Sequence, residues 1–250
     1  MIDILIPTIE DDLPMLRLTI ESVHKNIEDE VNKIFIICPE SDKIKEFCEN
    51  NKCEYINEKE YIGFTKNIFG FGGRNGWFYQ QLLKLNGNTL VECDNFLALD
   101  ADHVLLKPHL FVDGDKFNFY TSKEYHVPYF VTMNKLFNGT IGKTIDKSFI
   151  SDKMIFNKDA LIKMKGEIEK NCNDNWINAI ANNCYNHNEC GFSEFETYGT
   201  YFFTLYRNNV NLIDDERLMC FEKRIERMTL DELSEEFNNY KSITEFRYAR

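Results

Sequence analysis

Short apolar runs alternate with amphipathic stretches through the first sixty residues. Residues 2–6 and 33–38 are nearly continuous apolar runs, a pattern typical of strands buried on both faces of a parallel sheet, and residues 54–56 form a shorter strand. Between them, residues 13–27 carry apolar side chains at helical spacing, and residues 41–48 begin with Ser-Asp, which favours a capped helix. The alternation predicts a parallel sheet with right-handed crossovers.

A glycine-rich stretch, residues 61–76, interrupts this pattern and is predicted to be a loop. Helical spacing resumes over residues 77–85. The apolar run 96–99 predicts another buried strand, and a second run at 104–106 follows before Pro108 ends it. The remaining predicted elements are strands at 117–120 and 148–156 and helices at 158–170, 174–186, 193–206 and 229–240.

These elements predict an α/β fold with a Rossmann-like, mostly parallel central sheet flanked by helices, and a helical C-terminal third. The chain has 250 residues, of which 43% are hydrophobic, including 21 Phe and 12 Tyr, so it can bury a large core. No linker-like stretch divides the sequence. We therefore expect a single domain over residues 1–250.

Composition narrows the classes of partner and compartment. A net charge of −12 argues against a nucleic-acid partner, because binding to phosphates needs a basic surface. The eight cysteines form no Cys-x-x-Cys pair and no zinc-ligand spacing. The first residues are too acidic for a signal peptide, and no apolar run approaches the roughly 20 residues that cross a bilayer. We expect a cytoplasmic protein without a transmembrane segment.

Two aspartates follow the buried strand 96–99. Asp100 and Asp102 stand at the strand end where open α/β sheets bind ligands, and their i, i+2 spacing keeps both on one side. Unpaired carboxylates are costly there, whereas Mn²⁺ or Mg²⁺ carrying a nucleotide diphosphate would stabilise them. The alternative is a solvated turn with capping aspartates. The position of the pair favours a metal site.

Four motifs occur in one order along the chain: Ile4-Leu-Ile-Pro-Thr8, Gly76-Trp-Phe-Tyr-Gln-Gln-Leu-Leu-Lys-Leu85, Leu97-Ala-Leu-Asp-Ala-Asp102 and Ser193-Glu-Phe-Glu-Thr-Tyr-Gly199. Over residues 2–206 the chain resembles the GT-A glycosyltransferases, and among them a largely uncharacterised bacterial and viral group with Gly-Trp-x-x-Gln-Gln, Asp-x-Asp and Ser-Glu-x-Glu-x-Tyr-Gly motifs. The resemblance implies a GT-A type fold, with residues 1–110 as the nucleotide-sugar-binding half and residues 111–250 as the acceptor-binding half.

The resemblance also implies a nucleotide-sugar donor, with UDP favoured over GDP, bound over the first half of the sheet. Asp102 would ligate the Mn²⁺ or Mg²⁺ that bridges the diphosphate, Asp100 would face the ribose or the metal, and Ala101 lies between them. Residues at the end of the first strand lie where such enzymes hold the base and the ribose: Pro7, Thr8 and Glu10. For Glu10, a solvated acidic loop is an equal alternative.

The loop and helix before the aspartates supply further polar candidates. Arg74 lies among glycines that let a backbone approach a ligand closely, so it is a candidate for contact with a phosphate or an acceptor. Gln80, Gln81 and Lys84 lie within about one helical turn, and Gln81 and Lys84 can share a face that grips a sugar or a phosphate. Trp77 lies on the apolar stripe, which favours core packing over sugar stacking.

The segment Ser193–Gly199 supplies the best candidates for a catalytic base. Glu194 and Glu196 are acidic, but Ser193 with Glu196 also matches a capping box, which would leave Glu194 exposed at the first helical position. By resemblance the segment faces the cleft, and we favour Glu194 as the base. Asp152 is a third candidate. Many GT-A enzymes add a late histidine to the metal, but His187 here matches no such motif and is expected in an exposed loop.

The sequence therefore predicts a metal-dependent hexosyltransferase that moves a sugar from a nucleotide diphosphate to a hydroxyl of a glycan or similar acceptor, inverting with a glutamate base. One alternative is a sugar nucleotidyltransferase, which usually has a glycine-rich signature after the first strand, whereas residues 7–12 are acidic and lack glycine. The other is a non-catalytic carbohydrate-binding protein, which would not need the carboxylates together.

Overall fold

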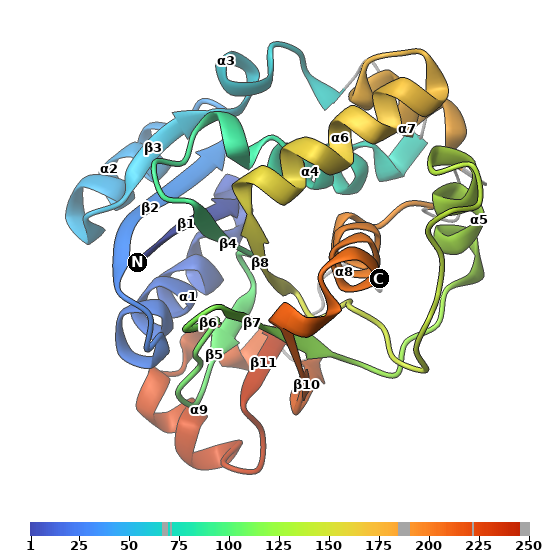
Figure 1. Ribbon diagram of the computed structural model, residues 1–250. Helices are drawn as coiled ribbons and strands as arrows, with labels where there is room; N and C mark the ends of the chain where they lie inside the picture. The colour runs from blue at the N-terminus through green and yellow to red at the C-terminus, as the bar shows by residue number, and fades with distance from the viewer. Residues whose placement is uncertain (67–69, 71, 185–190, 222, 246–250) are drawn as a thin grey trace.

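The computed structural model describes residues 1–66, 70, 72–184, 191–221 and 223–245. At its centre lies a five-stranded sheet with the order β3-β2-β1-β4-β8 (Figure 1). The first four strands are parallel, and β8 runs antiparallel to β4. The strands are β1 Ile2–Pro7, β2 Val31–Cys38, β3 Glu54–Asn57, β4 Asn95–Leu99 and β8 Lys153–Asn157. This confirms the mixed α/β fold with a mostly parallel central sheet.

The apolar runs of the sequence form the inner strands. All six residues of β1 are buried, because the sheet is covered on both faces. Ile4 pairs with Leu97 of β4, and Leu97 in turn pairs with Ile155 of β8. The strand predicted over 148–156 begins only at Lys153. Asp152 has a φ of 57°, a left-handed conformation that a regular strand does not contain.

Helices cover both faces of the sheet (Figure 1). Right-handed crossovers place α1 and α2 on one face, and the return of the chain past β1 to β4 places α4 on the other, where α6 and α8 join it. The helices are α1 Leu13–Asn26, α2 Asp42–Asn51, α3 Glu58–Ile62, α4 Asn75–Leu85, α5 Val127–Leu136, α6 Lys158–Cys172, α7 Trp176–Asn183, α8 Glu194–Leu205 and α9 Leu230–Glu236. Short 3₁₀ turns span Glu10–Asp12, Gly72–Arg74, Gly87–Thr89, Arg207–Asn209 and Lys223–Arg227.

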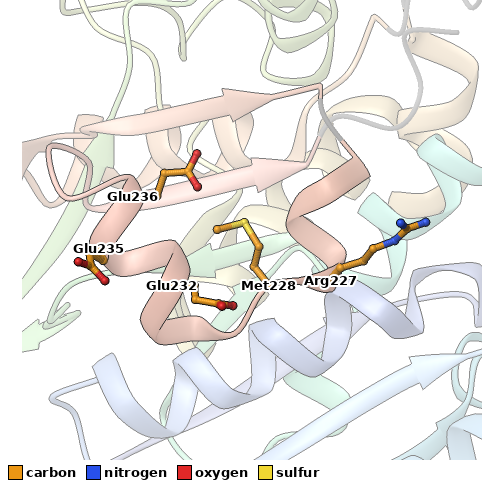
Figure 2. Close-up of a pocket in the computed structure, with 5 residues that line it drawn as sticks. All are labelled: Arg227, Met228, Glu232, Glu235 and Glu236. Carbon is orange, nitrogen blue, oxygen red and sulfur yellow. The ribbon is translucent and has the colours of Figure 1, made fainter.

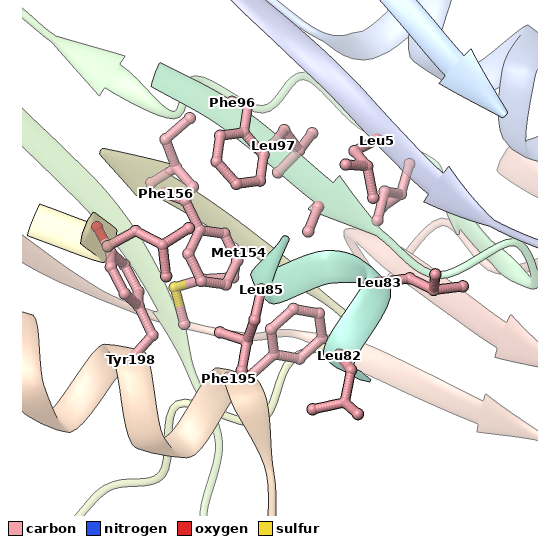
Figure 3. Packing of buried hydrophobic residues seen from close by; sticks show 14 of the residues in the cluster. Leu5, Leu82, Leu83, Leu85, Phe96, Leu97, Met154, Phe156, Phe195 and Tyr198 are labelled. Atoms are coloured by element: carbon pink, nitrogen blue, oxygen red, sulfur yellow. The ribbon is translucent and has the colours of Figure 1, made fainter. Parts of the chain in front are cut away.

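Aromatic packing fixes α8 against the sheet (Figure 3). Phe96 of β4 stacks on Phe156 of β8 with ring centroids 5.2 Å apart, and Phe156 meets Tyr198 of α8 at 4.2 Å. The hydroxyl of Tyr198 accepts a hydrogen bond from the backbone N–H of Asn157 at 2.8 Å. These contacts hold the start of α8 beside α4, near the carboxyl end of β4.

Two smaller sheets contain β7, which the sequence predicted over 117–120, together with strands that it did not predict. One has the order β10-β11-β5 and the other β6-β7-β9. Their strands are β5 His103–Leu105, β6 Val112–Asp113, β7 Lys116–Thr121, β9 Val210–Asp214, β10 Arg217–Cys220 and β11 Ser242–Glu245. The C-terminal third therefore contains β9, β10 and β11 besides its helices. β9 and β10 are short and half-buried and mix polar with apolar residues, so they lack the apolar runs that identified β1 and β2.

The predicted helices of the last third are present; α6 extends two residues beyond its predicted end at 170, and the other three are shorter than predicted. The helix predicted over 174–186 ends at Asn183, and residues 185–190 lie outside the described part of the chain. The helix predicted over 229–240 ends at Glu236. Among the described residues, no helix is long and apolar enough to cross a membrane.

Candidate active site

A turn after β4 carries the two aspartates that the sequence singled out. Asp100, Ala101 and Asp102 connect β4 to β5, and the backbone N–H of Asp100 donates to the carbonyl of Asp152 at 3.0 Å. The hydroxyl of Thr19 in α1 donates to the carbonyl of Ala101 at 2.8 Å. Because β1 and β4 are parallel neighbours, this turn lies at the same sheet edge as the end of β1.

Lys84 of α4 joins the two best candidate carboxylates. Its ammonium binds Asp100 and also Glu194, the latter at 2.7 Å, while the side chain of Lys84 is only 2% exposed. The backbone N–H of Glu194 donates to the side-chain oxygen of Gln81 at 3.1 Å. Gln81 and Lys84 therefore share a face, as predicted, and both contact the first residue of α8. A buried lysine between two carboxylates is a costly arrangement to build, because all three charges must leave water.

Glu194 is buried rather than exposed. The capping box predicted an exposed side chain at the first helical position, and this was wrong, since the residue is 4% exposed. The hydroxyl of Ser193 does cap the helix by accepting from the N–H of Glu196 at 3.2 Å. The helix end is not at the surface, because α8 packs against both β8 and α4. The predicted cap is therefore present, but the packing of α8 buries the Glu194 side chain that was expected to be exposed.

Glu196 faces a different neighbour. One carboxylate oxygen accepts from the hydroxyl of Ser148 at 2.5 Å and from the N–H of Phe149 at 3.0 Å, and the other accepts from Thr200 at 3.2 Å. Burial raises the pKa of Glu196, while these hydrogen bonds lower it in part. The carboxylate of Glu196 thus ties α8 to the segment before β8.

Asp152, the third candidate for the base, belongs to a network that the sequence did not reveal. Its carboxylate binds the guanidinium of Arg217 and accepts from the hydroxyl of Thr244 at 2.7 Å. The second arm of Arg217 reaches Glu124 at 2.8 Å. Arg217 is 6% exposed, so it bridges β10 to the edge of the central sheet from a mostly buried position.

A second buried ion pair lies beneath this network. Lys153 donates to Asp215 at 2.8 Å, and both side chains are 1% exposed or less. His103 lies with its Nδ1 2.7 Å from the Thr244 hydroxyl and its Nε2 3.2 Å from the ammonium of Lys153. Burial, with Lys153 and Arg217 nearby, holds the pKa of His103 well below its usual value, so its ring is neutral. In the sequence, Arg217 belongs to the charged run 214–217, a pattern typical of a solvated loop. Its buried position becomes apparent only when β10 is known.

The environment of the two carboxylates after β4 disfavours their ionised forms. Burial raises the pKa of Asp100 to about 6, although Lys84 opposes the shift. Burial raises the pKa of Asp102 well above its usual value, and the charges of Asp100, Asp152 and Asp12 raise it further. Burial lowers the pKa of Lys84, but its two carboxylate partners outweigh this and the net shift is upward. The edge of the sheet therefore holds more negative charge than its cations offset.

This excess of negative charge fits a divalent cation. Asp100 and Glu194 pair with Lys84, and Asp152 pairs with Arg217, whereas the main charges that act on Asp102 are those of other carboxylates. Within the described residues, no three His, Cys, Asp or Glu side chains gather as a ready-made metal cage. Mg²⁺ and similar ions commonly take one or two carboxylates from a protein and complete their shell with substrate phosphates and water. The aspartates suit that kind of site.

The other predicted residues lie around this centre. Thr8, at the end of β1, is 6% exposed, and its N–H donates to the carbonyl of Ile37 at 2.9 Å; Pro7 is the last residue of β1. Glu10 accepts from Ser41 at 2.8 Å and binds Lys43 at 2.5 Å, and its hydrogen bonds with Lys43 and Ser41 lower its pKa.

The glycine-rich loop lies partly outside the described residues, which lack 67–69 and 71. Arg74 is exposed at the start of α4, and Gln80 is partly buried. Trp77 is partly buried and packs against the main core, and its remaining surface is exposed. His187 also lies outside the described part of the chain.

A surface hollow of about 520 Å³ lies away from these residues (Figure 2). It is lined by Arg227, Met228, Glu232, Glu235 and Glu236. These residues come from the 3₁₀ turn 223–227 and the segment around α9, which pack against α1. None comes from β4, α4 or the start of α8, so the hollow is separate from the carboxylate site.

Comparison with known proteins supports the fold. A family model described as "Family of unknown function (DUF6492)" matches residues 2–242. Mouse xyloside xylosyltransferase 1 superposes with a TM-score of 0.53 at 12% identity, over 100% of this chain and 99% of that chain. The galactosyltransferase LgtC, solved with donor and acceptor sugar analogues, gives 0.50 at 13% identity, over 100% and 88% of the two chains.

A third solved structure, the bifunctional glycosyltransferase WbbM, gives a TM-score of 0.51 at 10% identity, over 100% of this chain and 46% of that chain. No protein of curated function matches this chain in sequence. At such low identities the structural likeness establishes the fold, which is that of GT-A glycosyltransferases.

Proposed function

This chain belongs to the DUF6492 family, and we propose that it is a metal-dependent glycosyltransferase. In this proposal it moves a sugar from a nucleotide diphosphate, UDP in preference to GDP, to a hydroxyl of a glycan or similar acceptor. The observation that carries the proposal is the buried arrangement Asp100–Lys84–Glu194 at the carboxyl edge of β4. Ligands bind at that edge in open α/β folds. The fold shared with solved glycosyltransferases supports the same reaction class.

The aspartates of the β4–β5 turn would hold the donor. Asp102, assisted by Asp100, would bind Mn²⁺ or Mg²⁺, and a bound ion would offset the negative charge of the leaving diphosphate. The raised pKa of Asp102 supports this, because ionised Asp102 lacks enough nearby positive charge. Pro7, Thr8 and the backbone of Ala101 would contact the base and ribose, at the same sheet edge.

Glu194 is the proposed general base. In the transfer, the acceptor oxygen bonds to the anomeric carbon while the bond from that carbon to the diphosphate oxygen breaks. The acceptor hydroxyl proton passes to Glu194, and the diphosphate leaves with the bonding electrons. Lys84 fixes the position of Glu194 relative to Asp100. Glu196 and Asp152 are weaker candidates, because each already accepts several hydrogen bonds or ion pairs.

This mechanism makes a stereochemical prediction. A base that activates an acceptor on the face opposite the diphosphate inverts the anomeric configuration. Proton NMR of the product would show the opposite anomer from the donor. A product with retained configuration would contradict the role of Glu194 as the base of an inverting transfer.

We propose that the two halves of the chain bind different substrates, as the sequence suggested. Residues 1–110 contribute β1 to β4 and would bind the nucleotide sugar. Residues 111–250 would bind the acceptor, with Trp77, Gln80 and Gln81 of α4 bordering it. A sugar nucleotidyltransferase is less well supported, because the segment after β1 has no glycine and its Glu10 is engaged by Lys43.

The test is hydrolysis of the donor, which needs no knowledge of the acceptor. A panel of UDP- and GDP-sugars would be incubated with the protein and Mn²⁺, and released nucleotide would be measured. At least one sugar nucleotide should be hydrolysed, and chelation of the metal should stop the reaction. A panel in which none is hydrolysed with or without added metal would overturn the proposal.

Glu194→Gln should keep donor affinity and lower transfer by on the order of 10²-fold or more. Glu46→Gln, an exposed glutamate of α2, is the matched control and should behave like the wild type. Wild-type transfer by Glu194→Gln would move the base to another residue.

A further inference from the structure

A small aromatic cluster lies on the surface where the chain enters α5. Tyr125 is 61% exposed, and the neighbouring Val127 is 53% exposed. Single exposed apolar side chains are common on protein surfaces, whereas a group of them often marks a site for a ligand or a partner. Tyr125 stacks on Phe130 with ring centroids 5.4 Å apart and an interplanar angle of 30°. Phe130 packs against the main core, so it supports Tyr125 from below.

One face of the Tyr125 ring is directed toward Phe130, and the opposite, outer face is open. The ammonium of Lys143 lies 5.1 Å from the centroid of Tyr125 and 5.4 Å from that of Phe130. With the rings themselves 5.4 Å apart, the three points form a nearly equilateral triangle. A cation over the outer face of Tyr125 would be much farther from Phe130. Lys143 therefore lies within cation–π distance of both rings, on the side of Tyr125 that is near Phe130, and it also donates to the carbonyl of Lys147 at 2.8 Å.

This cluster is continuous with the candidate active site. Glu124, the residue before Tyr125, binds Arg217 at 2.8 Å, and the other arm of Arg217 binds Asp152. The carbonyl of Asp152 accepts from the N–H of Asp100. Glu124, Arg217 and Asp152 thus connect the aromatic surface to the aspartates of the β4–β5 turn. Glu124 remains 49% exposed, so its carboxylate can still meet a ligand.

We propose that the open face of Tyr125 stacks against a pyranose ring of the acceptor saccharide, with Glu124 and Lys143 hydrogen-bonding the ring hydroxyls. The proposal rests on the proposed function, because it is the acceptor that must lie next to the donor site. A pyranose has one face of C–H groups that packs on an aromatic ring and a rim of hydroxyls that needs polar partners. A flat ring flanked by one carboxylate and one ammonium matches both needs at the size of a single sugar.

The test measures saccharide binding without donor or metal. Saturation-transfer-difference NMR would be run on the full-length protein with methyl glucoside, methyl galactoside, lactose, maltose, cellobiose and chitobiose. At least one saccharide should receive saturation on the C–H protons of one ring face. Tyr125→Ala should weaken its Kd by about tenfold, and Tyr125→Phe should retain it. An absence of signal across the panel, or equal signal with Tyr125→Ala, overturns the proposal.

A matched control separates this site from nonspecific contact with exposed rings. Phe221 is 58% exposed and lies four residues past Arg217, roughly 13 Å away at the rise of a strand. Phe221→Ala should leave saccharide binding unchanged. Loss of binding in that variant, with Tyr125→Ala unaffected, would move the saccharide elsewhere. Because donor hydrolysis is measured separately, failure of that assay with saccharide binding intact would refute the enzymatic function and not this site.

Discussion

Replacing Lys84 with methionine tests the electrostatics on which the candidate site depends. Methionine fills a similar volume but removes the charge between Asp100 and Glu194. The side chains of these carboxylates are 21% and 5% exposed, so water compensates only partly for the lost cation. Removing one partner of a buried ion pair typically costs about 3–5 kcal/mol, because the remaining charge is left uncompensated. We expect a loss in that range at pH 7.5.

The loss should depend on pH in a defined direction. Burial already raises the pKa of Asp100 to about 6, and Lys84 is a cause that lowers it. Without Lys84 the folded-state pKa rises further above the unfolded value. A carboxylate with a raised folded pKa destabilises the fold above that pKa, and the penalty disappears as the group protonates below the unfolded value. The stability gap between variant and wild type should therefore shrink from pH 7.5 to pH 5.

Urea unfolding followed by circular dichroism at both pH values measures this gap. Lys165→Met is the matched control, because Lys165 is also buried but binds the carbonyl of Leu85 and the side chain of Asn88 rather than a carboxylate. Burial lowers the pKa of Lys165 to about 8, so its charge state changes little between pH 5 and pH 7.5. Its stability gap should be nearly constant. A loss below about 1 kcal/mol for Lys84→Met, or a gap that does not shrink, would refute the reasoning.

Three further variants probe other parts of the molecule. Asp102→Asn should abolish manganese-dependent UDP binding in calorimetry, and unchanged UDP affinity would contradict the metal assignment. The same variant should raise the Tm without metal at pH 7.5, because burial and neighbouring carboxylates disfavour ionised Asp102. Gly199→Ala should destabilise the protein by about 1–3 kcal/mol in the same urea assay, since a Cβ there would lie 2.3 Å from Phe149. Its control, Gly166→Ala, has open space around the new Cβ and should be neutral or slightly stabilising. Arg217→Met should cost about 3 kcal/mol by removing the guanidinium partner of the Asp152 carboxylate, and Arg217→Lys should recover part of that loss. Equal stability of Arg217→Met and wild type would show that the bridge is not needed.

The sequence predicted the strands of the central sheet and β7, and it missed the other strands of the two smaller sheets. β1 and β2 are apolar runs because the sheet is covered by helices on each side, and such runs are visible in one dimension. β9 and β10 have half-buried residues, and their pairing depends on distant partners such as β7 and β11. Nothing in the local pattern of residues 210–220 distinguishes them from a charged loop.

In the candidate site, too, the sequence identified residues with a local pattern and missed those that depend on distant partners. Asp100 and Asp102 were recognisable because they follow an apolar run directly. Lys84 and Gln81 were identified as a shared face, and their contact with Glu194 follows from how α8 packs on β8. The exposure predicted for Glu194 was wrong because a capping pattern describes a helix end and not what packs over it. Arg217 was missed because its role depends on strands that were missed.

The pairing of β11 with β5 has a consequence for how the chain matures. Residues 103–105 follow the turn that carries Asp100 and Asp102 directly, yet their strand partner is supplied by residues 242–245, and the imidazole of His103 meets Thr244 across 141 positions of sequence. A nascent chain emerging from the ribosome can form β1 to β4 long before that partner exists. This edge of the fold would therefore be completed only after residues 242–245 have been synthesised, and a cut between β10 and β11 would loosen that edge while leaving the central sheet intact.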